Sequence, residues 1–264
     1  MTLESLIHGD ARSNADAGVS HVAAVFDPVF ERLERWAALV EEYVGRSDSD
    51  RNTLDPLMEA LVRREFADSD GGVIGAGFVS APSFLGWHLA WWLGGQNAAG
   101  SALPTVGIRQ LETIDDSNDE SFRDYTALEW WQVPERTGRR HVTGPYVDYL
   151  CTDEYTLTLT LPVYRNVTEL IGVVGIDLSV DQIERELVPR LTAGVVTVTV
   201  VNASGRVVVS TDTRLATGAL LRLPGLTERL GDPAPGPALF ADGCHTFQWC
   251  GQAGLAVVAG PMRG

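Results

Sequence analysis

Residues 155–179 read YTLTLTLPVYRNVTELIGVVGIDLS, and this stretch decides the fold class. In its first part, 155–161, tyrosine and leucine alternate strictly with threonine. A period of two predicts a half-buried β-strand, which we expect to end at Pro162. The apolar run 170–178 follows a connection of turn-forming residues. We therefore expect the two strands to pair as a hairpin.

A helix is predicted directly after this hairpin. Ser179 stands three residues before Gln182, which is the spacing of a capping box. The helix is expected to run to about Leu187 and to end before Pro189, because proline lacks the backbone N–H that a continuing helix needs.

Helical periodicity dominates the N-terminal part of the chain. Over 22–44 apolar residues recur in steps of three and four, which predicts a helix with one face in the core. Asp27-Pro28 lies inside this pattern, so the helix either starts or kinks there. A continuous helix over 17–44 would be roughly 42 Å long, enough to lie along two lobes. Coiled-coil dimerisation is the alternative.

The remaining elements are short. Asp55-Pro56 repeats the aspartate-proline signal and predicts a second helix over about 56–66. The glycines of 75–77 are assigned to a strand, because the run continues into Ser80-Ala81-Pro82 where a phosphate-binding helix would have to begin. The strands predicted outside the hairpin are 73–79, 87–93, 195–201, 207–210, 245–250 and 255–259.

The order helix, helix, sheet, helix, smaller sheet predicts an α+β fold with two lobes. We expect an N-terminal helical segment over 1–68, a first lobe over 69–190 and a second, smaller lobe over 191–264.

Composition narrows the classes of function. The chain has 20 basic and 35 acidic residues, a net charge of -15, which disfavours nucleic acid and anionic membrane surfaces as partners. Every basic residue is arginine, so a Schiff-base lysine, a Walker lysine and a lysine general base are excluded. The first 18 residues lack a signal-peptide pattern, and no apolar run reaches the roughly 18 residues of a membrane span. A soluble, cytoplasmic protein is expected.

Metal and nucleophile chemistry are also disfavoured. Cys151, Cys244 and Cys250 are an odd number in no zinc-ribbon spacing, so we expect reduced thiols. Cys244-His245 and Cys250 offer at most three metal ligands, and placement in paired strands is the preferred interpretation. The five histidines form no metal or triad spacing, and no Gly-x-Ser-x-Gly elbow occurs. We predict neither a metal nor a cofactor.

Three motifs follow one another in the middle of the chain. They are GPYVD at 144–148, LPVY at 161–164 and GVVGIDLS at 172–179. In this order they resemble the first lobe of a double Cache sensor domain, a PAS-like ligand-binding domain of chemoreceptors and sensor kinases. The resemblance covers about residues 122–183. It implies a long first helix and two PAS-like antiparallel-sheet lobes, of which the second is compact here.

The resemblance also implies a ligand site in the first lobe. Family members that bind amino acids use an arginine, an aromatic pair close after it, a Tyr-x-Asp and a final aspartate. The aromatic pair is matched by Trp130-Trp131, the middle motif by Tyr146 and Asp148, and the last acid by Asp177.

Two positions depart from the family pattern. The arginine that would hold a ligand carboxylate is replaced by Leu128, beside the acidic Glu129, and a tyrosine expected upstream is replaced by Arg123. Another arginine, Arg109 or Arg123, could restore that contact. The candidate ligand-binding residues are Tyr125, Glu129, Trp130, Trp131, Tyr146, Asp148, Tyr155 and Asp177.

This aromatic and acidic set suits a cation. An ammonium group over an aromatic face gains about 0.5–2 kcal/mol, and a charge-assisted hydrogen bond to a carboxylate adds roughly 1.5–3 kcal/mol. We therefore expect an amine in a cage of indole and phenol rings. In the simpler alternative, the tryptophans only pack in the core and Asp177 bonds the start of the following helix. Of Trp87, His88, Trp91 and Trp92, strand alternation can send only half to the pocket.

Three functions compete at this level. The first is a stand-alone sensor module that binds a small amine or amino acid, performs no chemistry, and signals through a protein partner or a second copy of itself. The second is a small-molecule enzyme with Asp148, Asp177 or Glu129 as general base. The third is a structural dimer built on the long helix. The sensor that is not an enzyme is the preferred prediction.

Overall fold

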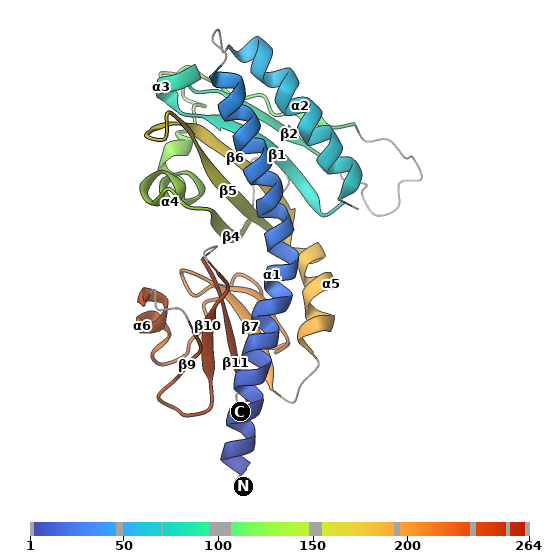
Figure 1. The fold of residues 1–264 in the computed structure, drawn as a ribbon, viewed down its shortest axis with the longest axis vertical. Helices are drawn as coiled ribbons and strands as arrows, with labels where there is room; N and C mark the ends of the chain where they lie inside the picture. The colour runs from blue at the N-terminus through green and yellow to red at the C-terminus, as the bar shows by residue number, and fades with distance from the viewer. Residues whose placement is uncertain are drawn as a thin grey trace.

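The computed structural model describes residues 3–45, 50–69, 71–94, 107–147, 155–192, 196–232, 236–251 and 254–261, with side chains from residue 11 onward. The fold is α+β, as predicted. One long helix carries two antiparallel sheets, stacked end to end along it (Figure 1). We call the part with the six-stranded sheet the upper lobe and the part with the five-stranded sheet the lower lobe.

The long helix α1 (Leu3–Val44) spans both lobes. It continues through Pro28, so of the two alternatives for Asp27-Pro28 a helix start is excluded, and the helix begins earlier than residue 17. Its apolar stripe, which includes Phe26, Phe30 and Leu33, is buried against both sheets in one continuous core. The stripe is therefore covered by the chain itself, and the coiled-coil alternative loses its motivation.

Helix α2 (Arg51–Asp68) covers the upper sheet beside α1 (Figure 1). Its cap is Asp50, whose carboxylate accepts a hydrogen bond from the Thr53 N–H at 3.0 Å. The predicted start at Asp55-Pro56 is wrong because the cap lies five residues earlier, and Asp55 instead accepts from His88 Nε2 at 2.7 Å.

The upper sheet has the strand order β3-β2-β1-β6-β5-β4, and all neighbours are antiparallel. The predicted hairpin of β5 and β6 is confirmed. The strands are β1 (Val73–Ser80), β2 (Leu89–Leu93), β3 (Arg109–Gln110), β4 (His141–Val147), β5 (Tyr155–Arg165) and β6 (Glu169–Ser179).

Strand β5 differs from its prediction in two ways. It runs past Pro162, because β4 pairs with it only as far as Thr160 and a missing N–H is tolerated where one side has no neighbour. It is also buried on both faces, not on one: Leu157 and Leu159 pack in the core below α1, and Thr158 lies on the opposite, equally covered face. That second face carries the site described below.

Helix α5 (Val180–Leu191) follows β6 as expected, but its ends differ. The Ser179 side chain makes no capping hydrogen bond, and Gln182 instead accepts from Arg185, so the predicted capping box is wrong. Pro189 lies inside the last turn and does not stop the helix before it. Three short helical segments complete the upper lobe: α3 (Pro82–Leu85), η1 (Tyr125–Ala127) and α4 (Glu129–Thr137).

The lower sheet has the order β8-β7-β11-β10-β9. It contains the predicted pairs around 202–205 and at the C-terminal end, with ends shifted by one or two residues. The elements are β7 (Thr197–Asn202), β8 (Val207–Ser210), α6 (Leu226–Gly231), β9 (Ala238–Leu239), β10 (Thr246–Trp249) and β11 (Leu255–Gly260).

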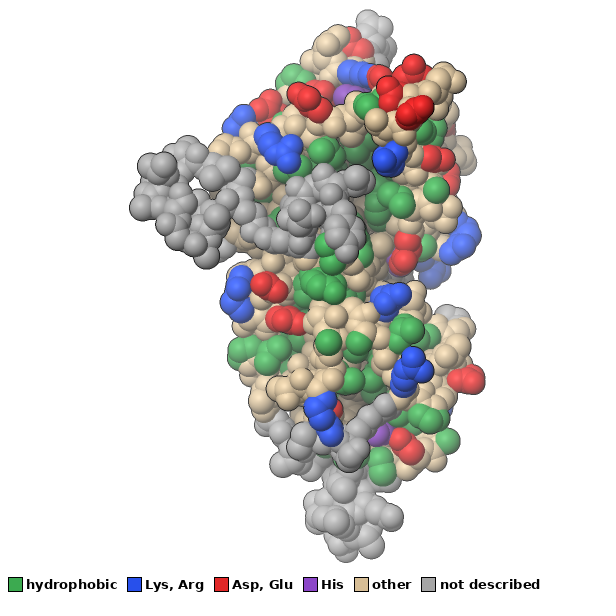
Figure 2. Space-filling model, turned by 180° about the vertical axis from the view of Figure 1, so that it is seen from behind, with side chains coloured by type: hydrophobic (Ala, Val, Ile, Leu, Met, Phe, Trp, Pro, Cys, Tyr) green, Lys and Arg blue, Asp and Glu red, His purple; other side chains and the backbone are tan. Residues whose placement is uncertain are grey.

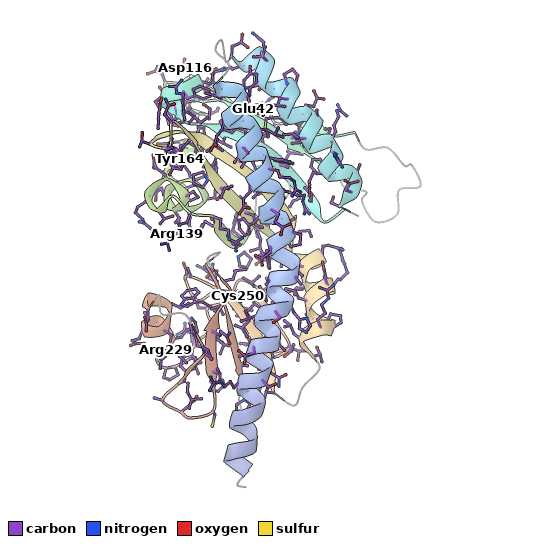
Figure 3. All side chains as sticks on the ribbon, viewed as in Figure 1. Glu42, Asp116, Arg139, Tyr164, Arg229 and Cys250 are labelled. Carbon is purple, nitrogen blue, oxygen red and sulfur yellow. The ribbon has the colours of Figure 1, made fainter. Side chains whose placement is uncertain are left out.

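Polar contacts join the upper lobe to the lower lobe and to α1. The Asn202 side chain of the lower lobe donates to the Gly144 carbonyl of the upper lobe at 2.6 Å, and Arg140 pairs with Asp27 of α1 at 3.1 Å. Cys250 is a buried free thiol at the end of β10 nearest the upper lobe (Figure 3), and burial raises its pKa to about 12. Cys151 lies outside the described residues. None of the described helices is apolar over enough of its length to cross a bilayer.

Candidate ligand-binding site

A cavity of about 490 Å³ lies in the upper lobe, on the face of the sheet that points away from α1. Its floor is formed by side chains of the central strands, including Val79, Thr158 and Asp177. Its cover is formed by α4, η1 and the segment 111–123. The cavity therefore lies between the sheet and a layer of loop and short helix that stands off from it.

A directed chain of hydroxyl groups ends on a buried carboxylate in the floor. The Thr158 hydroxyl donates to Asp177 Oδ1 at 2.6 Å, so its single hydrogen is committed. Tyr146, whose hydroxyl oxygen lies 2.6 Å from that of Thr158, must then be the donor in their bond. Two aligned donors stabilise negative charge on Asp177, which is only 5% exposed.

The floor beside Asp177 is the indole of Trp91. A Cβ atom on Gly175 would lie 3.1 Å from the Trp91 ring, and one on Gly75 would lie 2.9 Å from its Nε1. The same Gly75 position lies 2.8 Å from Asp177 Oδ2. The indole thus occupies space that is available only because these strand positions lack side chains, and its nitrogen edge and the carboxylate converge over Gly75.

Aromatic rings also form the wall above the floor. Trp87 packs edge-on against Phe122 and Tyr125, with ring centroids 4.8 and 5.1 Å apart, and Tyr125 stacks at 6.1 Å on Trp130. The Tyr125 hydroxyl donates to the Ser80 carbonyl at 2.7 Å, and burial raises its pKa well above the usual value. Tyr125 therefore stays neutral, and its ring serves as fixed apolar surface.

The mouth of the cavity carries charge of both signs. Glu112 and Arg123 line it, and both are exposed. Arg123 Nη1 donates to the carbonyl of Phe122 at 3.0 Å, which holds the guanidinium near the rim. The neighbouring acidic loop, which contains Asp116, lies at the outer end of the upper lobe (Figure 3), and Figure 2 shows acidic side chains gathered there.

Four of the eight predicted site residues line the cavity together: Tyr125, Trp130, Tyr146 and Asp177. Asp148 lies outside the described residues. The other three, Glu129, Trp131 and Tyr155, are described but do not line the cavity. The expected convergence of two indoles, a phenol and two aspartates is therefore met for one indole, Tyr146 and Asp177.

The structure explains why three of the predicted residues do not line the cavity. Successive residues on a helix point about 100° apart, so Trp130 faces the cavity while Trp131, 1% exposed, packs behind the wall. Glu129 turns to β4 and accepts from His141 Nε2 at 2.9 Å. Tyr155 shares the strand parity of the core-facing leucines, is 47% exposed, and lies beside Gly218 of the lower lobe.

The structure shows which side chains of the predicted strand 87–93 reach the cavity. Trp87 and Trp91 line the cavity, Trp92 packs on the core side, and His88 is engaged by Asp55. Arg123 lines the mouth, whereas Arg109 is exposed on the short edge strand β3 and does not line the cavity.

Several lining residues were not among the candidates. Thr158 and Thr160 form the polar face of β5, and the period-two pattern places them opposite the core-facing leucines, so that signal was present. Leu111, Ile114 and Phe122 come from a segment without periodicity, and only the tertiary structure places them over the sheet. Among the described residues, no group of three histidine, cysteine or acidic side chains is arranged to hold a metal ion.

Comparisons with known proteins agree with this geometry. Residues 103–185 match the family described as methyl-accepting chemotaxis protein-like, first PDC sensor domain. This segment contains most of the cavity-lining residues. No curated protein matches the sequence.

Solved structures resemble the chain over nearly its whole length. The ligand-binding domain of the Pseudomonas fluorescens chemoreceptor CtaA, in complex with L-isoleucine, is 13% identical, with 99% of this chain and 94% of that chain covered and a TM-score of 0.60. The sensory domain of the Campylobacter jejuni chemoreceptor Tlp3 with isoleucine bound is 12% identical (97% and 91% covered, TM-score 0.56). The ligand-binding domain of the Pseudomonas aeruginosa amino acid chemoreceptor PctC with GABA is 16% identical (92% and 95%, TM-score 0.52).

The resemblance to double Cache sensor domains is thus confirmed. The chain has the fold of these chemoreceptor ligand-binding domains, and residues 103–185 of its upper lobe match the family model of a first PDC sensor domain.

Proposed function

We propose that this protein is a sensor module whose upper lobe binds a small amine-containing metabolite. The observation that carries this proposal is the Tyr146–Thr158–Asp177 hydrogen-bond chain, which ends on a carboxylate inside an aromatic-walled cavity. The ammonium group of the ligand would bind Asp177, because this buried carboxylate lines the cavity and a charge-assisted hydrogen bond from N–H to a carboxylate is among the strong ones.

The expected energies suit a metabolite sensor. A charge-assisted hydrogen bond contributes roughly 1.5–3 kcal/mol, and an aromatic face near a desolvated cation contributes about 0.5–2 kcal/mol. A few such contributions, less the cost of association, reach the roughly 8 kcal/mol of micromolar binding. Trp91 and Trp130 supply the faces on two sides of the cavity.

An amino acid is the second candidate ligand, and one observation favours it. Arg123 lines the mouth, where its guanidinium would meet a ligand carboxylate while Asp177 holds the ammonium. The chemoreceptor structures were solved with isoleucine or GABA, which both carry an amine and a carboxylate. Against this candidate, Arg123 is exposed, and Leu128 stands where the family places its carboxylate-binding arginine.

No chemistry on the ligand is required by this proposal. A sensor of this kind acts through another protein or a second copy of itself, and both partners remain predictions, as does a location in the cytoplasm. Incubation of the protein with a bound ligand, followed by mass spectrometry, tests the enzyme alternative. A converted ligand would contradict the sensor assignment.

Calorimetry on the whole chain distinguishes the two ligand classes. We expect amines to bind with micromolar affinity, and the corresponding carboxylates without an amine not to bind. Arg123→Gln should leave amine affinity unchanged within about twofold. If Arg123→Gln weakens binding of an amino acid at least tenfold while the decarboxylated amine binds poorly to the wild type, the amino acid candidate replaces the amine.

A further inference from the structure

The size of the cavity restricts the ligand beyond its amine group. At about 490 Å³ the cavity lies in the range of roughly 300–1,000 Å³ that accommodates drug-sized ligands. An amine of three or four carbon atoms, bound at Asp177, would leave Leu89, Ile114 and Val173 facing water across the remaining space. Filling that space with apolar ligand surface is favourable, because it removes this wall from water.

The distribution of charge restricts the ligand further. Among the described lining residues, Asp177 is the buried charged group at the floor, and Glu112 and Arg123 are exposed at the mouth and opposite in sign. Exposed charges interact weakly with a ligand, and two of opposite sign partly cancel. The described part of the lining therefore offers little stabilisation to a second ammonium group on the ligand. The body of the ligand should be uncharged.

The shape of the floor adds a third restriction. The Trp91 indole lies over Gly75 and Gly175, and its Nε1 edge and Asp177 Oδ2 both lie within 3 Å of the position of a Gly75 Cβ. The carboxylate is thus at the edge of a flat aromatic surface. Trp87 and Tyr125, whose rings pack edge-on against each other at 5.1 Å, also line the cavity. A flat group attached near an ammonium would lie against the indole.

We propose that the ligand is an arylalkylamine, in which a short alkyl chain joins an ammonium group to an aromatic ring, and that Trp91 determines this specificity. The inference rests on the amine-binding function proposed above. Aromatic contacts of favourable geometry are worth about two- to tenfold in affinity each, and Trp91 and its neighbours can make more than one with a single ring.

The test compares ligands that differ in one group. Calorimetry on the whole chain would use phenethylamine, n-propylamine, putrescine and phenethyl alcohol. We expect phenethylamine to bind at least tenfold more tightly than n-propylamine and putrescine, and phenethyl alcohol not to bind measurably. This comparison uses the wild-type protein and therefore does not depend on the folding of any variant.

A variant then assigns the specificity to Trp91. Trp91→Leu should reduce the preference for phenethylamine over n-propylamine to threefold or less. Because Trp91 also offers a face to the ammonium group, the affinity for n-propylamine should fall too, but by a smaller factor than the affinity for phenethylamine. Trp249→Leu is the matched control, because Trp249 lies in the lower lobe, and it should retain the wild-type preference.

The possible failures are distinguishable. Equal affinities for phenethylamine and n-propylamine, or tighter binding of putrescine, would overturn the arylalkylamine inference and leave the amine sensor in place. An unchanged preference in Trp91→Leu would overturn the role of Trp91. Binding of carboxylates but of no amine would overturn the proposed function, and the inference with it.

Discussion

The upper and lower lobes are built alike, yet they differ in what lies on the sheet face that α1 does not cover. In the upper lobe this face carries a cavity of about 490 Å³. In the lower lobe the corresponding space among the described residues is about 20 Å³, enough for roughly one water molecule. The two lobes therefore share one architecture, but the described part of the upper lobe encloses a cavity and that of the lower lobe is filled by side chains.

The covering segments explain this difference. In the lower lobe, Leu221, Leu223, Leu226 and Phe240 pack directly on the sheet and form a second hydrophobic core. In the upper lobe, the cover is made of large rings that contact one another, such as Trp87, Phe122 and Tyr125, and bridge over the sheet. Flexible leucines collapse onto a flat face, whereas a linked layer of rings spans a space.

The sheets themselves also differ. Because Gly75 and Gly175 have no side chains, the Trp91 indole can lie directly on the upper sheet. The equivalent face of the lower sheet carries Val201, Val207 and Val258, whose side chains occupy the space above the strands. The comparison shows that ligand binding is decided by side chains placed on this fold, not by the fold.

The largest effect on free energy is expected when a buried side chain of the lower lobe is removed. Phe247 is buried and packs edge-on against Trp249 at 5.2 Å. Phe247→Ala should lower the free energy of unfolding by about 3–5 kcal/mol through lost burial and a new cavity, as measured by urea denaturation. Ligand affinity in the upper lobe should change less than twofold. Glu34→Ala, at an exposed position of α1, is the control and should stay within about 0.5 kcal/mol of the wild type. A loss below about 1 kcal/mol in Phe247→Ala would contradict the description of the lower lobe as filled.

The next largest effect concerns the charged floor of the upper lobe. Asp177→Asn keeps the shape of the side chain but removes its negative charge, so amine affinity should fall roughly 30- to 100-fold, or about 2–3 kcal/mol. Calorimetry measures this change. Asp181→Asn removes the same charge from an exposed position on α5 and should leave affinity unchanged. Wild-type affinity in Asp177→Asn would exclude the carboxylate as the amine contact.

A smaller effect is expected when a methyl group is added to the cavity floor at Gly75. Gly75→Ala would place a methyl group 2.8 Å from Asp177 Oδ2 and 2.9 Å from Trp91 Nε1, so both groups must move. Amine affinity should fall about tenfold, and overpacking should cost about 1–2 kcal/mol of stability. Gly231→Ala, in the open space at the end of α6, is the control and should affect neither quantity adversely. Unchanged affinity in Gly75→Ala would show that the indole and the carboxylate need not share this position.

The smallest effect is expected at the start of the hydroxyl chain. Tyr146→Phe removes the donor to Thr158 but leaves the ring, so affinity should fall about three- to fivefold, near the 0.5–1.5 kcal/mol of a single hydrogen bond. The matched control is Tyr164→Phe on the far part of β5 (Figure 3), a residue that does not line the cavity. Equal losses in the two variants would mean that the Tyr146 hydroxyl does not act through Asp177.

Much of the fold could be predicted from local patterns. The alternation in 155–161 and the three-and-four spacing in 22–44 reflect burial of one face, and burial decides most of an element's free energy. Several predictions that failed concern the ends of elements, among them the helix ends at Asp55-Pro56 and Pro189 and the strand end at Pro162. In the helices a local proline or cap signal was outweighed by packing of the whole helix, which the sequence pattern does not report.

The candidate site was predicted less completely. Tyr146 and Asp177 lie on neighbouring elements of one sheet, where the motif and the strand parity agree. Adjacent tryptophans on a helix point about 100° apart, and the structure buries Trp131 behind the wall while Trp130 reaches the cavity, which the sequence motif alone does not reveal. Whether Trp91 or Trp92 reaches the cavity depends on which face of β2 points away from α1. The sequence does not reveal this, because tryptophans occupy both alternating faces of the strand.

By itself, the sequence determined the α+β class, the long first helix, the hairpin and the acidic, lysine-free character, because each follows from side-chain periodicity or from composition. Only the tertiary structure decided that one lobe is hollow and the other filled, and that an indole and a carboxylate meet over Gly75. Those properties depend on contacts between segments as distant as β1, β2 and β6, and no local pattern encodes the distance between them.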